Sequence, residues 1–147
     1  MPHFGLIDES LPDKEKYLLR ARLHIRGGKI RLSQGDISAG IAALYDAIIY
    51  SLYWFFLSNK QLESFLYDEQ GKYKHEKDLY LYLIEHRSID GKFNMEKFSD
   101  ITEEALNTNL FEFKANDLLE EYEGFMEQLK VLPYDENILP IDEPVTL

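Results

Sequence analysis

The chain has 147 residues, which is the length of about one domain, and 45% of them are apolar, as in proteins with a packed core. It contains no cysteine, and this excludes disulfides, cysteine-ligated zinc, iron–sulfur clusters and thiol nucleophiles. The net charge is −11, and because an acidic surface repels nucleic acid, we do not expect nucleic acid as a partner.

The charge is unevenly distributed along the chain. Residues 1–35 carry seven Lys and Arg against four Asp and Glu, residues 36–89 carry five against eight, and residues 90–147 carry four against fifteen. We expect the basic first segment and the acidic last segment to pack or pair with each other inside the fold. The alternative is a basic patch that is exposed to phosphate groups or to an acidic partner.

The first predicted helix begins near Ser10 or Asp13, either of which can cap it, and runs to about residue 33. Gly27 and Gly28 weaken it, but the apolar spacing keeps its phase through them, so we predict one continuous helix. A second, cationic stripe follows the same helix. The apolar stripe comprises Leu18, Ala21, Ile25, Gly28 and Leu32, and the cationic stripe comprises Arg22, Arg26 and Lys29.

The second predicted helix spans residues 37–57, after a helix end at Gly35 and a cap at Asp36. It is apolar on all sides and contains one charge, Asp46. Its length would allow a membrane span. However, a carboxylate at the centre of a bilayer costs about 2.5–3.5 kcal/mol, and the flanks lack a Lys and Arg bias. We therefore predict the central helix of a protein core, with no membrane contact.

Asp46 is the single residue of greatest interest in that helix. A buried carboxylate must be paired, hydrogen-bonded or protonated, so we expect Asp46 to bond a tyrosine hydroxyl or an arginine of the first helix. The alternative is that it lines a cavity or a dimer groove beside Tyr45, Tyr50 and either Arg22 or Arg26.

The rest of the chain predicts a helical extension to about Leu66, a loop around Gly71 and a third helix from about Tyr73 to His86. A short amphipathic helix capped by Asn94 and a last helix within residues 114–132 follow. The expected inward positions of these last two helices are Met95, Phe98, Ile101 and Leu106, then Leu118, Tyr122, Phe125, Met126 and Leu129.

The predicted fold is all-α: an up-and-down bundle of four to five helices over residues 1–132, with an extended C-terminal arm over residues 133–147. Three prolines in the arm disfavour a helix there. The apolar residues of the arm suggest that it packs on the bundle or on a partner. So short a chain covers the apolar second helix on only a few sides, which favours a homodimer.

The long first helix, the Gly35-Asp36 turn and the alanine- and tyrosine-rich "AGIAALYDAIIYSLYW" of the second helix resemble the HEPN family of small bacterial and archaeal helical proteins. The resemblance covers about residues 14–90. It implies one of two activities. Many members are ribonucleases that use an Arg and a His separated by four to six residues at a dimer interface, and others are binding partners, for example of nucleotidyltransferases or in toxin–antitoxin pairs.

The ribonuclease spacing is absent here, since three residues separate Arg20 from His24 and His86 directly precedes Arg87. We therefore predict a non-catalytic, cytoplasmic binding module whose candidate ligand or partner residues are Arg22, Arg26, Lys29, Asp46, Tyr45 and Tyr50. A nucleotide and a nucleotidyltransferase are possible partners of such a module. The alternatives are a ribonuclease with an atypical Arg20 and His24 arrangement, and a structural homodimeric subunit.

No cofactor or metal is expected. The "RGGK" sequence lacks the spacing and the preceding strand of a phosphate-binding loop, and the four histidines do not form a ligand set with the acidic residues.

Overall fold

A computed structural model describes residues 10–140, and over that range the protein is an all-α bundle, as predicted. The described residues form six α-helices and two short 3-10 helices, with an isolated bridge between Tyr67 and Tyr73 as their only β-type pairing. One more α-helix is present than the four to five expected, because a four-residue helix follows the second helix after a break.

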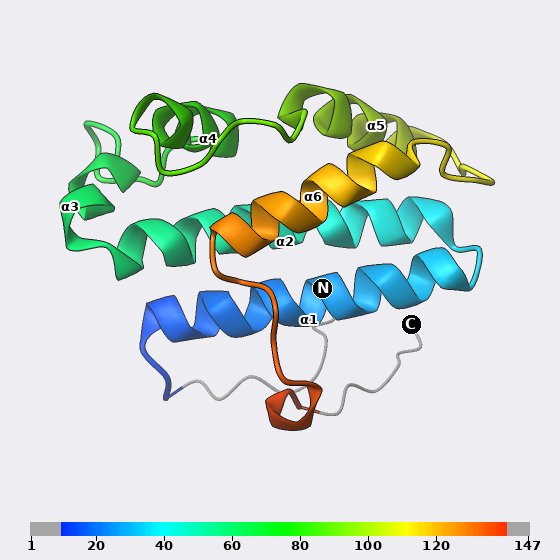
Figure 1. Ribbon diagram of the computed structural model, residues 1–147, viewed down its shortest axis with the longest axis horizontal. Helices are drawn as coiled ribbons and strands as arrows, with labels where there is room; N and C mark the ends of the chain where they lie inside the picture. Colours follow the sequence, from blue (N-terminus) through cyan, green and yellow to red (C-terminus); the bar gives the residue numbers. More distant parts are fainter. Residues whose placement is uncertain (1–9, 141–147) are drawn as a thin grey trace.

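Helices α1 (Asp13–Ser33) and α2 (Ile37–Ser58) form an antiparallel hairpin that is the base of the bundle (Figure 1). The prediction that α1 continues through Gly27 and Gly28 is confirmed. Gly28 is buried against α2: a Cβ atom added there would lie 2.9 Å from Leu44 Cγ and 3.0 Å from the carbonyl oxygen of Gly40. The glycine therefore allows close approach of the two helix backbones.

Helix α2 is the central element, packed between α1 on one side and α4 and α5 on the other, with α6 crossing it (Figure 1). It ends at Ser58 because Asn59 adopts an extended backbone, and the Asn59 side-chain amide donates to the carbonyl oxygen of Phe55. The expected extension to Leu66 is thus a separate helix α3 (Lys60–Glu63) and a 3-10 helix (Ser64–Leu66).

Helix α4 (Glu76–Glu85) begins three residues later than predicted. Residues 67–74 instead form a turn in which the Asp68 carboxylate accepts hydrogen bonds from the backbone amides of Gln70 and Lys72. The His75 side chain then caps α4 by accepting from the amide of Lys77.

Helices α5 (Met95–Asn107) and α6 (Asn116–Gln128) close the bundle. Asn94 caps α5 as predicted, and all five inward positions predicted for α6 and the residues just after it are buried. The prediction for Leu106 is wrong, since this residue is 70% exposed near the end of α5, beyond the part of that helix that meets the core. The main core cluster combines residues from every α-helix of the described range.

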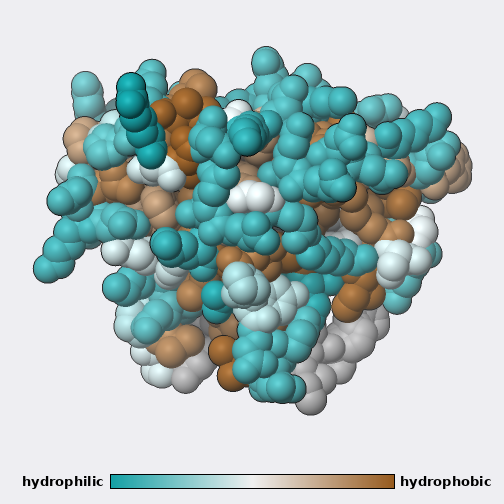
Figure 2. All heavy atoms as spheres, viewed as in Figure 1, coloured by the Kyte–Doolittle hydropathy of each residue, from teal (hydrophilic) through white to brown (hydrophobic). Residues whose placement is uncertain are grey.

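After α6, the chain crosses α1 and forms a 3-10 helix (Glu136–Ile138), so the start of the arm is not extended throughout (Figure 1). Leu139 is buried, whereas the expected apolar contacts of Ile141, Val145 and Leu147 lie outside the described residues. On the face of the molecule that carries α6, polar and charged residues cover most of the surface (Figure 2).

Candidate functional site

The cationic stripe of α1 contacts the C-terminal part of the chain. Arg22 Nε donates to the carbonyl oxygen of Val131 at 2.8 Å, and burial lowers the pKa of the Arg22 guanidinium. Arg26 Nη2 donates to the carbonyl oxygen of Pro140 at 2.7 Å, and its Nη1 lies 3.4 Å from Glu136 Oε1.

Lys29 completes this contact, with its Nζ 2.5 Å from Glu123 Oε2 on α6. Two ion pairs therefore join the basic first segment of the chain to its acidic last segment, as the charge distribution suggested. Each cation of the stripe therefore has an acceptor within the chain.

Asp46 is not placed as expected, because its side chain is exposed to solvent. The buried residues of α2 lie on the sides that face α1, α5 and α6, and Asp46 projects from the remaining side. The predicted bond to a tyrosine or to an arginine of α1 is absent from the described residues. Partial loss of hydration, together with the nearby Glu76 carboxylate, raises the pKa of Asp46.

Four tyrosine rings meet beside Asp46. Tyr17 of α1 lies 6.1 Å from Tyr50 and 5.2 Å from Tyr53 between ring centroids, and Tyr53 lies 4.4 Å from Tyr73 of the loop before α4. The Tyr17 hydroxyl donates to the Tyr73 hydroxyl at 3.2 Å. All four side chains are half-buried, and we call this set (Tyr17, Tyr50, Tyr53 and Tyr73) the tyrosine surface.

Three phenols of the tyrosine surface have raised pKa values. Burial raises the pKa values of Tyr50, Tyr53 and Tyr73, and neighbouring acidic groups and phenols raise them further, although the Arg20 cation opposes the rise in the pKa of Tyr50. The rings therefore offer neutral hydroxyl groups and flat apolar faces, which are the groups that tyrosine contributes at protein interfaces.

Tyr45 lies on α2 at the side of this surface that faces α4 and α5. Its hydroxyl donates to Glu76 Oε2 at 2.7 Å, and its ring stacks with that of Phe98 at a centroid distance of 6.4 Å. Burial and the Glu76 carboxylate raise the pKa of Tyr45. Tyr45 thus joins α2 to α4 and α5.

Arg20 and His24 border the tyrosine surface from α1. The Arg20 guanidinium carbon lies 5.8 Å from the centroid of the Tyr50 ring, and Arg20 Nε is buried without a hydrogen-bond acceptor among the described residues. His24 Nδ1 donates to the carbonyl oxygen of Arg20 at 2.8 Å, and the His24 side chain is 5% exposed. This hydrogen bond fixes the tautomer with the proton on Nδ1, because a carbonyl oxygen only accepts.

The structure thus separates the six candidate residues into two groups. Tyr45, Asp46 and Tyr50 share the open side of α2, whereas Arg22, Arg26 and Lys29 face α6 and the residues after it. Sequence reasoning missed Tyr17, Tyr53, Tyr73 and Arg20 as members of one cluster. Tyr17, Tyr53 and Tyr73 lie in three segments that are far apart in the chain. Helical spacing relates only residues of the same helix, so it could not bring these three together.

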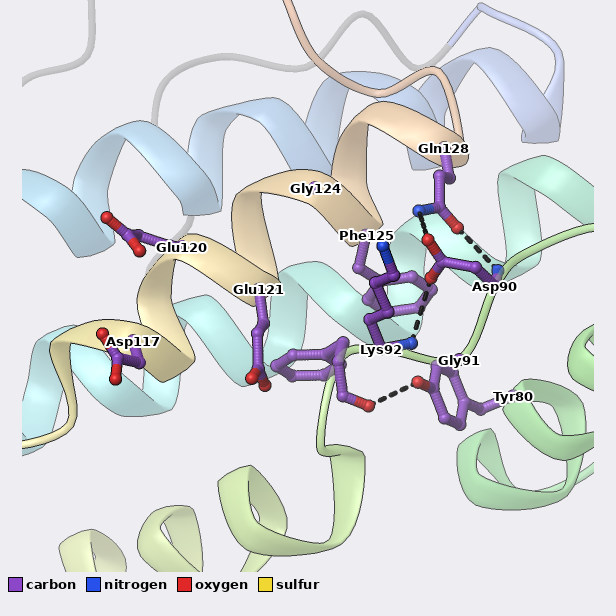
Figure 3. A pocket seen from close by; sticks show the side chains of 11 residues that line it. Tyr80, Asp90, Gly91, Lys92, Asp117, Glu120, Glu121, Gly124, Phe125 and Gln128 are labelled. Carbon is purple, nitrogen blue, oxygen red and sulfur yellow. Dashed lines mark hydrogen bonds between the residues drawn. The ribbon is translucent and has the colours of Figure 1, made fainter.

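A separate cavity of about 530 Å³ lies between α4, the loop before α5 and α6. Figure 3 shows the carboxylates of Asp117, Glu120 and Glu121 along α6 and that of Asp90, which accepts from Gln128 Nε2 at 2.9 Å. Hydrogen bonds from the backbone of Lys92 and from Gln128 lower the pKa of Asp90. This acidic lining disfavours phosphate-bearing ligands, and no group of three metal-ligating side chains occurs within residues 10–140.

Helix α2 is the one helix in the described part of the chain that is long and apolar enough to cross a membrane, judged by length and composition alone. Within its most apolar 18 residues, 56% are buried inside the protein, and a core helix passes the same test.

Comparison of the chain with protein-family models, with curated proteins and with solved structures finds no match. The HEPN resemblance therefore stays a prediction.

Proposed function

We propose that this chain is a non-catalytic interaction module that binds a protein partner through the tyrosine surface. The observation that carries the proposal is the set of four contacting, half-exposed tyrosine rings on the side of α2 that α4, α5 and α6 leave open. Tyrosine is enriched at protein interfaces because its ring supplies large contact area and its hydroxyl supplies a hydrogen bond.

The charges of the molecule support a protein rather than a nucleotide as the partner. Arg22, Arg26 and Lys29, the cations best suited to a phosphate, already contact acceptors of the same chain. Four of the eleven residues that line the cavity beside α6 are acidic, and one is a lysine. A nucleotidyltransferase, the partner that the HEPN resemblance implies, belongs among the candidates.

The adjacent Arg20 and His24 are the feature that favours the ribonuclease alternative. A general acid or base must reach the proton that it transfers, and the buried His24 offers little access to an RNA strand. We expect the purified chain to leave RNA uncut. Cleavage that is lost in His24→Ala and retained in His86→Ala, a control at an exposed histidine, would instead assign the enzymatic function.

The binding proposal is tested by quantitative affinity capture from the source cells. The double substitution Tyr50→Ser and Tyr53→Ser removes the rings at the centre of the tyrosine surface, and we expect it to lower the recovery of the specific partner at least tenfold. Tyr82→Ser is the matched control, because Tyr82 is a half-buried tyrosine of α4 outside that surface. Circular dichroism checks that each variant stays helical, and equal recovery by the folded double variant would refute the proposal.

A further inference from the structure

Two charged side chains, the Arg20 guanidinium over the Tyr50 ring and the exposed Asp46 carboxylate, lie at the open side of α2 and form no ion pair within the described residues. The guanidinium of Arg20 has no carboxylate or other hydrogen-bond acceptor within residues 10–140, and its Nε is already removed from water. The Asp46 carboxylate likewise has no hydrogen-bond donor or cation as a partner within that range, and the two residues do not pair with each other. This surface therefore presents a cation at Arg20, held over the Tyr50 ring, and an exposed carboxylate at Asp46, and a partner with the opposite charges at the same positions would complement both.

The same side of α2 is also graded in size along its length. Ala39 and Ala42 lie near its beginning, and Tyr53 and Leu57 lie near its end, and all four are half-buried. Ile49 lies between them, one turn from Asp46 and from Tyr53. Small residues at one end and large residues at the other make a surface that fits a reversed copy of itself.

From these two observations we propose that the partner on the tyrosine surface is a second copy of this chain, bound across a two-fold axis so that Arg20 of each copy pairs with Asp46 of the other. The inference rests on the proposed function, for which it names the partner. A two-fold axis that crosses α2 between Asp46 and Tyr50 runs the two α2 helices antiparallel. Asp46 of one copy then lies level with Tyr50 of the other, over which Arg20 sits.

This arrangement matches both the charges and the side-chain sizes of the surface. Each of the two symmetric contacts places the Asp46 carboxylate of one copy against the Arg20 guanidinium of the other, so two ion pairs form per dimer. Ala39 and Ala42 of one copy face Tyr53 and Leu57 of the other. An unrelated partner would need a carboxylate and a cation at the same spacing, whereas a second copy carries both by symmetry.

The test is a charge exchange measured by sedimentation velocity and by titration of a fluorescently labelled chain. Arg20→Glu places two carboxylates at each contact of its own dimer, and Asp46→Arg places two guanidinium groups there. We expect each variant alone to dimerise at least tenfold more weakly than the wild type. Mixing the two variants gives heterodimers in which both contacts are again opposite in charge, so the mixture is expected to recover affinity to within about threefold of the wild type.

Recovery in the mixture requires that both variants fold and that residues 20 and 46 meet across the axis, so a failure to fold cannot mimic it. The double variant with both exchanges in one chain provides the second check, since its homodimer also restores opposite charges. Glu85→Arg, at an exposed acidic residue at the end of α4, is the control that should leave dimerisation unchanged.

The outcomes separate this inference from the proposed function. A dimer that both single variants leave intact would place the contact elsewhere on the molecule and overturn the inference. A wild-type chain that stays monomeric at the highest concentration reached would overturn it too, and the proposed function would still stand if capture of another protein depended on Tyr50 and Tyr53. A chain that remains dispersed only with detergent would identify lipid as the occupant and overturn both.

Discussion

Gly28 and Gly40 set the distance between α1 and α2. Each lies against the backbone of the other helix, since a Cβ atom on Gly28 would come 3.0 Å from the carbonyl oxygen of Gly40, and one on Gly40 would come 2.9 Å from that of Gly28. Contacts this short leave no room for a methyl group unless the helices move apart. The close packing of α1 against α2 therefore requires glycine, which has no side chain, at both positions.

We expect Gly28→Ala to destabilise the protein by about 1 kcal/mol. The helix gains up to about 1 kcal/mol of intrinsic propensity, but overpacking against Leu44 and the α2 backbone costs about 1–3 kcal/mol. The free energy of unfolding is measured by urea titration with circular dichroism. Gly124→Ala in α6 is the control: nothing lies within 4 Å of its added Cβ, so we expect it to raise stability by up to about 1 kcal/mol. A Gly28→Ala protein as stable as the wild type would contradict the close approach.

The sequence correctly predicted that Gly28 is buried and wrongly predicted that Asp46 is buried. Both outcomes have the same physical reason. In α1, polar residues mark the uncovered sides, so the spacing of Ala21, Ile25 and Gly28 identifies the buried face. In α2, apolar residues surround the whole helix, and the pattern does not show which side the rest of the chain covers. This composition predicts burial of Asp46, but the helices of the described range leave this side of α2 uncovered.

At the scale of elements, the residues after α6 complete the cover over α1. Val131 and Pro140 supply carbonyl oxygens to Arg22 and Arg26, and Leu139 is 7% exposed. The opposite charges of the first and last segments predict that the two segments meet. They do not predict which residues meet, because Arg22 and Arg26 donate to backbone carbonyl groups, and every residue type has one.

Leu139 and Ile138 offer a matched test of this contact. We expect Leu139→Ala to lower the free energy of unfolding by about 2 kcal/mol, the lower end for a buried leucine, because its segment packs on one side only. Ile138 is 69% exposed, so Ile138→Ala is expected to change stability by less than about 0.5 kcal/mol. Urea titration of both variants measures the difference, and equal effects would mean that this segment does not pack on the bundle as described.

For the molecule as a whole, the buried tyrosines make the stability of the folded state depend on pH in the alkaline range. Burial raises the pKa of seven of the ten tyrosines, to about 12 for Tyr80 and for Tyr134. Tyr122 is fully buried in the core, with its hydroxyl donating to the carbonyl oxygen of Leu44 at 2.6 Å. The folded state holds these protons more tightly than an unfolded chain, in which phenols ionise near pH 10.

We therefore expect stability to be insensitive to tyrosine ionisation below about pH 10 and to fall as the pH rises from about 10 towards 12. The sign follows because between those values the folded state binds more protons than the unfolded state. Most of the phenolate absorbance should appear in the same step in which the far-ultraviolet circular dichroism of the helices is lost. Phenolate absorbance that is complete while the helices stay intact would contradict the prediction.

The contact between α1 and the residues that follow α6 also affects how the protein is made. The partners of Arg22 and Arg26 lie 109 to 114 residues further along the chain. At a synthesis rate of about 5–20 residues per second, α1 is synthesised roughly 5–20 seconds before residues 131–140. During that interval Arg22 and Arg26 lack the acceptors that residues 131–140 later supply.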